Sequence, residues 1–266
     1  MTQKIRVGQD MPAIHERRTA DANASFLTRH LQPGMSLLDC GCGPGTITIG
    51  LADWVAHGKV TGVDIDPKRV EQATATAESA GVANVAFQMG DIYQLPFPDA
   101  SFDAAFMTYV LMHLKDRQSA VREVMRILKP GGIFGAREMN MNARIELNAS
   151  PEWTEAVPLI NAHLRARGID IYAGATLGAL VRDAGFTEVD ESVSFNSHST
   201  PEALRFNAEQ QAHRLETTIA DFAVEQGLAE RAEVERMAKG VREWTHRDEF
   251  SAGAMQQVVG WKPQAG

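Results

Sequence analysis

The chain has 266 residues, of which 44% are hydrophobic, and a formal net charge of −8 at pH 7. This acidic balance argues against a nucleic-acid surface, which needs a concentration of Lys and Arg. No apolar run reaches the ~18 residues of a membrane span, and the polar N-terminus lacks the apolar core of a signal peptide. We therefore expect a globular cytoplasmic protein that binds neither nucleic acid nor membrane.

Strands and helices alternate along the first half of the chain, which predicts a parallel sheet with helices on both faces. A first helix is expected over 18–31. The elements that follow are strands at 36–40, 60–64, 84–88, 103–108 and 132–137, and helices at 45–56, 67–80 and 117–128. Helix stops are expected at Gly81 and in the turn Lys129-Pro130-Gly131-Gly132.

The second half of the chain is less regular. Residues 145–172 are mixed, with Pro151, Trp153 and Pro158 near a short helix, and a further helix is expected at 176–184. A strand over 188–196 precedes a long polar helical stretch, 201–245, and a last strand at 254–261 closes the chain.

The run from Leu37 to Ile49 is the most informative part of the sequence, because a strand leads through Gly41, Gly43 and Gly45 directly into a helix. Glycine is needed where a chain leaves a strand in a sharp turn and where backbone must approach a ligand closely. The next strand ends in Asp64, at a distance at which a carboxylate suits the two hydroxyls of a ribose.

The glycine spacing bears on which nucleoside is bound. Dinucleotide-binding enzymes use Gly-x-Gly-x-x-Gly, so that a pyrophosphate rests on the helix N-terminus. Here the third glycine comes one residue early, and Asp39 stands two residues before the first. An acid at this position argues against a pyrophosphate and for a ligand that carries a cation.

This pattern resembles that of the class I S-adenosylmethionine-dependent methyltransferases, whose ligand carries a sulfonium and an ammonium group. The motif sequences are most similar to those of the ubiquinone/menaquinone-biosynthesis-type branch, which acts mainly on small molecules. The strong resemblance covers about 34–137. It implies an α/β fold with a Rossmann-like, seven-stranded, mostly parallel, doubly wound sheet, in which one strand is antiparallel.

The resemblance also implies roles for individual residues. Asp64 matches the acid that binds the ribose, and Ile65 matches the apolar residue that packs on one face of the adenine. Asp91 matches an acid that accepts from the adenine amino group, and Ile92 covers the ring. The full set expected to bind S-adenosylmethionine is Arg18, Asp39, Gly41, Cys42, Gly43, Gly45, Asp64, Ile65, Asp91, Ile92 and Met107.

Several residues are candidates for a role in catalysis or positioning. His113 follows the fourth strand and is either a general base or part of a helix start, and Tyr109 either lines an apolar pocket or packs. Arg18 suits the methionine carboxylate of the cofactor. Arg137 and Glu138 end the fifth strand, where acceptor-facing residues belong, but an ion pair without chemistry is the alternative.

The sequence contains two cysteines, Cys40 and Cys42, both at the glycine loop. Their spacing favours neither a disulfide nor a zinc site, so we interpret them as small residues in a crowded loop of a reducing compartment. No metal site is expected.

A long segment separates the last two strands, which form a hairpin in the resembled fold. Residues 199–249 are too many for a hairpin loop and are expected to be a helical insertion. Its apolar residues recur at helical spacing and are expected to pack inward: Leu204, Leu215, Ile219, Phe222 and Leu228. The insertion is either a lid or wall of the acceptor pocket, or else a dimer contact or surface decoration.

We therefore expect one methyltransferase domain over 1–266, divided into segments 1–33, 34–137, 138–198, 199–249 and 250–266. The expected activity is methyl transfer from S-adenosylmethionine to a small-molecule acceptor by in-line displacement, which yields S-adenosylhomocysteine. The alternatives are other S-adenosylmethionine chemistry, such as cyclisation, decarboxylation or aminopropyl transfer, and an inactive scaffold. The intact acidic and glycine motifs argue against the scaffold, and a homodimer is left open.

Overall fold

The structure is a computed structural model, and it describes residues 17–198, 200–243, 250–264 and 266. The chain forms two compact units, each assembled from separate segments. The first comprises Met1–Glu138, Ala173–Val193 and Gln256–Gly266, and the second comprises Met139–Tyr172 and Ser194–Met255. The segment boundaries expected from the sequence remain a prediction, and residues 1–16 of the N-terminal segment lie outside the described residues.

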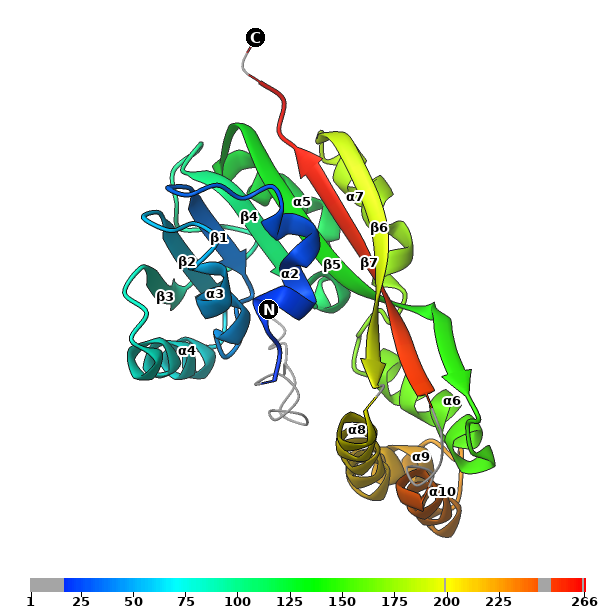
Figure 1. Ribbon diagram of the computed structural model, residues 1–266. Coiled ribbons are helices and arrows are strands. Elements are labelled where there is room, and N and C mark those ends of the chain that lie inside the picture. Colours follow the sequence, from blue (N-terminus) through cyan, green and yellow to red (C-terminus); the bar gives the residue numbers. More distant parts are fainter. Residues whose placement is uncertain (1–16, 199, 244–249, 265) are drawn as a thin grey trace. The chain divides into compact units, whose positions relative to one another are not determined.

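Seven strands of the described residues form one sheet in the order β3-β2-β1-β4-β5-β7-β6 (Figure 1). Strands β1 to β5 pair in parallel. Gly131 donates to the carbonyl of Lys262, and Lys262 donates to that of Gly132, so β7 runs antiparallel to β5. The strand bounds are β1 Ser36–Cys40, β2 Lys59–Asp64, β3 Val85–Met89, β4 Phe102–Thr108, β5 Leu128–Leu147, β6 Thr187–His198 and β7 Phe250–Trp261.

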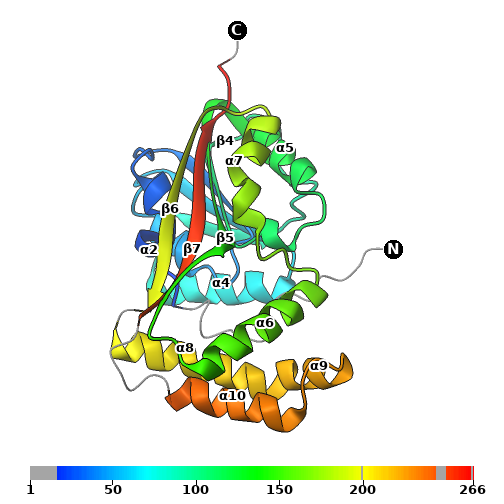
Figure 2. The ribbon, with the colours of Figure 1, turned by 90° about the vertical axis from the view of Figure 1, so that its right-hand side faces the viewer.

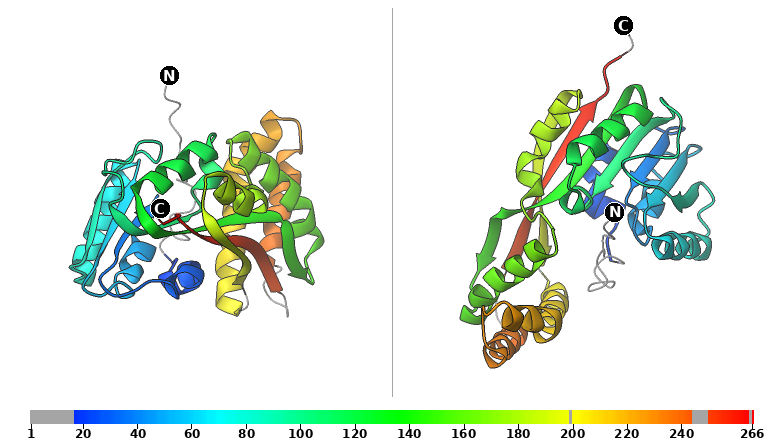
Figure 3. Two further views of the ribbon diagram at one scale, coloured as in Figure 1. Left: turned by 90° about the horizontal axis from the view of Figure 1, so that it is seen from above. Right: turned by 180° about the vertical axis from the view of Figure 1, so that it is seen from behind.

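Helices cover both faces of the sheet, and neighbouring strand residues belong to different cores. Leu37 packs with α2 (Ala20–Thr28) and α3 (Thr46–Leu51), whereas Leu38 packs with α5 (Arg117–Ile127) and α7 (Leu177–Asp183). Figure 3 shows α2 and α5 on opposite faces. This alternation is the period of a strand that is buried on both sides. The doubly wound α/β fold expected from the sequence is thereby confirmed.

The fifth strand differs from the expectation. Residues 129–132 were expected to form a turn before a strand at 132–137, but β5 begins at Leu128 and continues to Leu147. Gly131 has φ +75, and the pairing register with β4 shifts between Phe102 and Ala104. The local turn is therefore an irregularity within a longer strand, because the chain resumes pairing on both sides of it.

The second unit is mainly helical (Figure 2). It contains α6 (Pro151–Ala166), α8 (Pro201–Arg214), a π-helical turn η3 (Leu215–Ile219), α9 (Ala220–Glu225) and α10 (Arg231–Glu243). Helix α6 is longer than the short helix expected, since Ser150 caps it and Pro151 occupies its first turn. These helices share their own apolar core, which includes Trp153, Leu215, Ile219, Val234 and Val241.

Among the apolar residues of the insertion that are expected to pack inward, Leu204, Leu215 and Ile219 are buried and Phe222 is half-buried, but Leu228 is 50% exposed. The reason is local: Gly227 adopts φ +64 after α9, and the Leu228 N–H then bonds back to the Ala223 carbonyl. This capping turn takes Leu228 off the helical face that the sequence spacing assigned to it.

Within the described ranges, every helix is too short or too polar to cross a lipid bilayer.

Candidate active site

The candidate site lies at the carboxyl ends of β1 to β4, beside the residues of β5 that end the first unit's segment. Parallel strands place their carboxyl ends at one edge of the sheet, where open α/β sheets bind their ligands. The pairing registers align Cys40 with Val63, Asp64 with Met89, and Thr108 with Arg137. The residues that follow these strands, from 41–45 to 109–113, are therefore neighbours at that edge.

The glycine loop follows β1 and is held by the next strand. The N–H groups of Gly41 and Cys42 both donate to the Val63 carbonyl, at 2.8 and 3.0 Å. Gly41, Gly43 and Gly45 all have positive φ, at +77, +54 and +81. This left-handed backbone is the conformation that glycine adopts without steric cost, so the loop depends on all three glycines.

The three glycines differ in what surrounds them. A Cβ at Gly41 would overlap Val110 Cγ2, and one at Gly45 would lie 2.8 Å from Ala73 Cβ and 2.9 Å from Phe87 Cζ. A Cβ at Gly43 would meet no heavy atom of the described residues within 4 Å. Gly41 and Gly45 are therefore required by protein packing, whereas the space at Gly43 is open to a ligand.

Asp39 lies inside β1 just before the loop and is almost fully buried. Its Oδ2 accepts a hydrogen bond of 2.6 Å from the Thr48 hydroxyl in the first turns of α3. Burial raises the pKa of the Asp39 carboxyl to about 7, and the hydrogen bond from Thr48 opposes that rise. A buried acid with so high a pKa is poised to ionise when a cation approaches it.

Asp64 ends β2 and faces the same loop. Its Oδ2 accepts from the Gly43 N–H at 2.9 Å, and its Oδ1 accepts from the Asp66 N–H at 3.0 Å. Burial raises the pKa of Asp64, while these two backbone N–H groups lower it. Each carboxylate oxygen keeps a further lone pair with which it can accept a hydroxyl.

Apolar side chains stand exposed beside Asp64. Ile65 is 50% exposed and Met89, at the end of β3, is 54% exposed. These two exposed side chains offer apolar surface on which a flat aromatic ligand can pack. The expected adenine acid, Asp91, is exposed and its Oδ1 accepts from the Tyr93 N–H at 2.9 Å, while Ile92 packs against the core.

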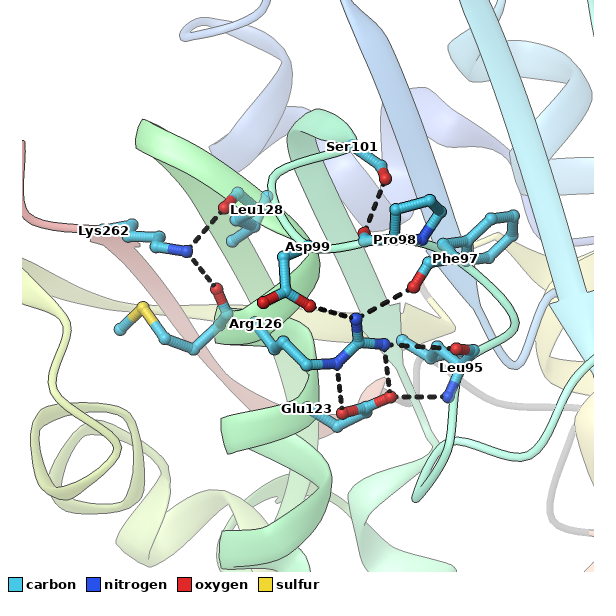
Figure 4. Close-up of polar contacts among 10 residues, drawn as sticks. Leu95, Phe97, Pro98, Asp99, Ser101, Glu123, Arg126, Leu128 and Lys262 are labelled. Atoms are coloured by element: carbon cyan, nitrogen blue, oxygen red, sulfur yellow. Dashed lines mark hydrogen bonds and ion pairs between the residues drawn. The ribbon is translucent and has the colours of Figure 1, made fainter. Parts of the chain in front are cut away.

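The loop after Asp91 is anchored to α5 by a charged network (Figure 4). Arg126 donates to the carbonyls of Leu95 and Phe97 and to the carboxylates of Asp99 and Glu123. Glu123 in turn accepts from the Leu95 N–H at 2.7 Å. One guanidinium thus fixes the course of residues 95–99.

Tyr109 follows β4 in a left-handed conformation with φ +57, which is costly for a bulky residue. Its N–H donates to the Arg137 carbonyl at 3.1 Å. The Arg18 guanidinium lies 3.8 Å from the centre of the Tyr109 ring. Burial lowers the pKa of Arg18, and the nearby positive charge of Arg137 lowers it as well. Two residues that are 91 positions apart in the sequence are therefore brought together at the site.

The remaining expected residues lie in different surroundings. His113 ends the short helix η1 (Leu111–His113), and its N–H donates to the Val110 carbonyl. Met107 is fully buried in the core with α5 and α7. Cys42 lies in the loop and Cys40 ends β1, and burial raises the pKa of both thiols. The described residues include no group of three His, Cys, Asp or Glu that could hold a metal ion.

Two contacts at the site were not anticipated from the sequence. Thr48 binds Asp39, and Val110 packs against Gly41. The sequence does contain a signal for Thr48. The apolar residues Ile47 and Leu51 indicate which face of α3 is buried, and Thr48 is a polar residue on that face. No sequence signal identifies Val110, because its contact depends on how β1 and β4 are paired.

Comparisons with known proteins agree with this geometry. Residues 31–176 match the model of the methyltransferase domain family. An uncharacterized methyltransferase of Schizosaccharomyces pombe is 30% identical over 204 residues, which are 74% of this chain and 70% of that protein.

Solved structures share the fold. The YcgJ protein of Bacillus subtilis superposes with a TM-score of 0.60 and 20% identity, covering 91% of this chain and 98% of that one. Phosphoethanolamine N-methyltransferase 2 of Haemonchus contortus, solved with S-adenosyl-L-methionine, has a TM-score of 0.57 and 18% identity, covering 92% and 53%. From the match to the family model and the curated relative, the chain belongs to the class I S-adenosylmethionine-dependent methyltransferases.

Proposed function

We propose that the chain transfers the methyl group of S-adenosylmethionine to a small-molecule acceptor at the carboxyl edge of β1 to β5. The observation that carries the proposal is the open space at Gly43, bounded by the Asp64 carboxylate. A ribose bound there has two hydroxyls to donate, and Asp64 has lone pairs to accept them. The residues present therefore fit the cofactor.

The other contacts follow from the same placement. Asp39 lies one strand away from Asp64 and supplies a negative charge for the cationic amino-acid end of the cofactor. Arg18 is suited to its carboxylate, because a guanidinium binds a carboxylate with two parallel hydrogen bonds. The exposed Ile65 and the Asp91 carboxylate serve the adenine, one by packing and the other by accepting its amino group.

The bound cofactor supplies an activated methyl group on a positively charged sulfur. A lone pair of the acceptor forms the new bond to carbon as the carbon–sulfur bond breaks, and the electron pair remains on sulfur in S-adenosylhomocysteine. The protein's contribution is alignment and exclusion of water, which can supply roughly 7–11 kcal/mol in the best intramolecular cases. Tyr109 directly follows β4 and His113 ends the short helix after it, and we assign these two side chains to orienting the acceptor or taking its proton.

The proposed acceptor is a small molecule rather than a nucleic acid, since the chain carries a net charge of −8. We further propose that the insertion over 199–249 contributes to the choice of acceptor, because loops and insertions on a rigid scaffold commonly carry specificity. Membership of the ubiquinone/menaquinone-biosynthesis-type branch is part of this proposal and rests only on the similarity of the motif sequences.

Incubation with methyl-labelled S-adenosylmethionine and a panel of small hydroxy, amino and thiol compounds tests the proposal. Mass spectrometry should detect a product heavier by one labelled methyl group, together with an equal amount of S-adenosylhomocysteine. S-adenosylhomocysteine formed without a labelled acceptor, or an altered acceptor without the label, would contradict methyl transfer. A Gly43→Val protein should give neither product.

A further inference from the structure

Glu138 is the last residue of β5 that belongs to the first unit, and it is fully buried. Its Oε1 accepts from the N–H groups of Val110 and Leu111, each at 2.8 Å. Its Oε2 is also buried and has no hydrogen-bond partner among the residues that the structure describes. The hydroxyl of Thr108, at the end of the neighbouring strand, is buried without a described partner as well. Two polar atoms are thus left unsatisfied at the edge where the site lies.

The backbone that Glu138 holds is the turn over 109–112. On one side this turn carries Tyr109, whose left-handed backbone is strained. On the other side Val110 fills the space over Gly41, where a Cβ would overlap Val110 Cγ2. The turn therefore links β5, at Glu138, to the glycine loop through a single buried carboxylate.

Holding a turn with a buried charge costs folding free energy. Burial raises the pKa of Glu138 to about 7, although the N–H groups of Leu111, Val110 and Met112 and the charge of Arg117 all lower it. Ionisation of this group therefore costs stability near neutral pH, rather than adding to it. Groups held at such a cost occur preferentially at functional sites.

We propose that Glu138 is a positioning residue for methyl transfer, which holds the turn over 109–112 against the glycine loop and so fixes Tyr109 relative to the cofactor. The inference rests on the proposed function only in placing the cofactor at Gly43. Glu138 acts through the backbone N–H groups of the turn and does not itself touch the reacting atoms. Protonation weakens its Oε1 as an acceptor, so the turn loosens as the pH falls.

Other charged and titratable groups face this carboxylate, so their effects on the pH dependence must be distinguished from the effect of Glu138. Arg117 begins α5, and Arg18 precedes α2 and interacts electrostatically with Glu138. Arg137 is its neighbour in β5, and Tyr109 and His113 flank the turn. His113 is the member of this group whose side-chain type ordinarily titrates between pH 5 and 8. A His113→Gln protein is therefore a necessary comparison.

Glu138→Gln tests the proposal because it keeps the shape and an acceptor oxygen but removes the charge. With S-adenosylhomocysteine as the probe, calorimetry at pH 8 should show roughly tenfold weaker binding. Hydrogen exchange of the Val110 and Leu111 amides should be faster than in the wild type. The melting temperature at pH 8 should not fall, which separates positioning from a purely structural role.

The pH dependence provides a second readout. Wild-type protection of these two amides, corrected for intrinsic exchange, should decline as the pH falls through about 7. Glu138→Gln should show no such decline, while His113→Gln should retain it. Equal protection and equal affinity in wild type and Glu138→Gln would overturn the inference, as would loss of the decline in His113→Gln alone.

Two further variants keep the test decisive if Glu138→Gln does not fold. Val110→Ala leaves Glu138 intact but removes the contact with Gly41, and it should also weaken binding of S-adenosylhomocysteine. Unchanged binding in Val110→Ala would overturn the inference. Asp103→Asn is the matched control, since Asp103 accepts from the Ser36 N–H far from the carboxyl edge; it should lower stability and leave binding unchanged. Failure of the wild type to bind the probe would instead contradict the proposed function.

Discussion

At the scale of single residues, the two acids of the site are expected to act differently. Asp64 already accepts two backbone N–H groups, so its proposed role is to add the ribose hydroxyls to an ordered carboxylate. Asp39 accepts the Thr48 hydroxyl, and its proposed role is to offer charge. The first role depends on hydrogen-bond geometry and the second on ionisation, so different measurements distinguish them.

Asp64→Ala should weaken S-adenosylmethionine binding by about 1.5–3 kcal/mol, since two hydroxyls lose a charged acceptor. Titration calorimetry should therefore record a dissociation constant raised by roughly ten- to a hundredfold. Asp53→Ala is the control, because Asp53 is an exposed acid in the turn after α3. An unchanged dissociation constant in Asp64→Ala would remove Asp64 from the site.

Asp39 should release a proton when the cationic cofactor binds near pH 7. Its pKa is about 7 in the free protein, and a nearby positive charge lowers the pKa of an acid. Calorimetry in two buffers with different ionisation enthalpies should show this release in the wild type and a smaller release in Asp39→Asn. Identical proton release in both proteins would assign it to another group.

The same residue predicts a dependence of stability on pH. Because the folded-state pKa of Asp39 is raised, the folded protein keeps a proton that the unfolded chain has lost between about pH 4 and 7. The free energy of unfolding therefore falls across that range, and the penalty is complete above pH 7. Asp39→Asn should gain stability relative to the wild type at pH 8, and gain less at pH 5.

At the scale of elements, the glycine loop provides a matched pair of substitutions. Gly43→Ala places a methyl group in open space, so its cost to folding is the left-handed backbone, roughly 1–2 kcal/mol. Gly45→Ala has this cost and also overlaps Ala73 and Phe87, which adds about 1–3 kcal/mol of overpacking. Thermal unfolding should show that Gly45→Ala is the less stable of the two proteins. Relative to its loss of stability, Gly43→Ala should show the larger loss of cofactor affinity.

The loop over 95–99 depends on α5 through Arg126. Arg126→Ala removes the guanidinium that donates to all four of these acceptors. The free energy of unfolding should fall by about 1–3 kcal/mol, after allowance for the partial exposure of Arg126. Hydrogen exchange over 95–99 should increase. Arg122→Ala, an exposed arginine on the same helix, is the control. Equal exchange in the two variants would mean that the loop is ordered by its own packing.

The sequence predicts the parts of the site that are local in the chain. Gly41, Gly43 and Gly45 lie within one turn, and Asp64 ends the next strand along the chain, so turn chemistry and strand periodicity locate them. Glu138 and Val110 are 28 residues apart and meet only through the pairing of β4 with β5. The extension of β5 was missed for a similar reason, because the glycines of 129–132 indicate a turn whichever pairing follows it.

At the scale of the whole molecule, the two units have separate apolar cores. Leu215 is fully buried in the second unit, so Leu215→Ala should lower the free energy of unfolding by about 2–5 kcal/mol. Below the unfolding transition, binding of S-adenosylhomocysteine should be unchanged, because the proposed cofactor residues all belong to the first unit. Leu228→Ala, at an exposed leucine, should change neither quantity. A parallel loss of binding in Leu215→Ala would show that the second unit supports the cofactor site.

The two buried thiols beside the glycine loop can report on local opening of the site and on ligand binding. Cys40 and Cys42 are the two cysteines of the sequence, and both are buried where β1 meets the loop. A thiol-modifying reagent can therefore react only when this part of the chain opens, and the rate of modification measures that opening. A ligand seated over Gly43 should slow the reaction in proportion to its occupancy. Candidate acceptors and cofactor analogues can thus be ranked by chemical labelling, without an engineered probe.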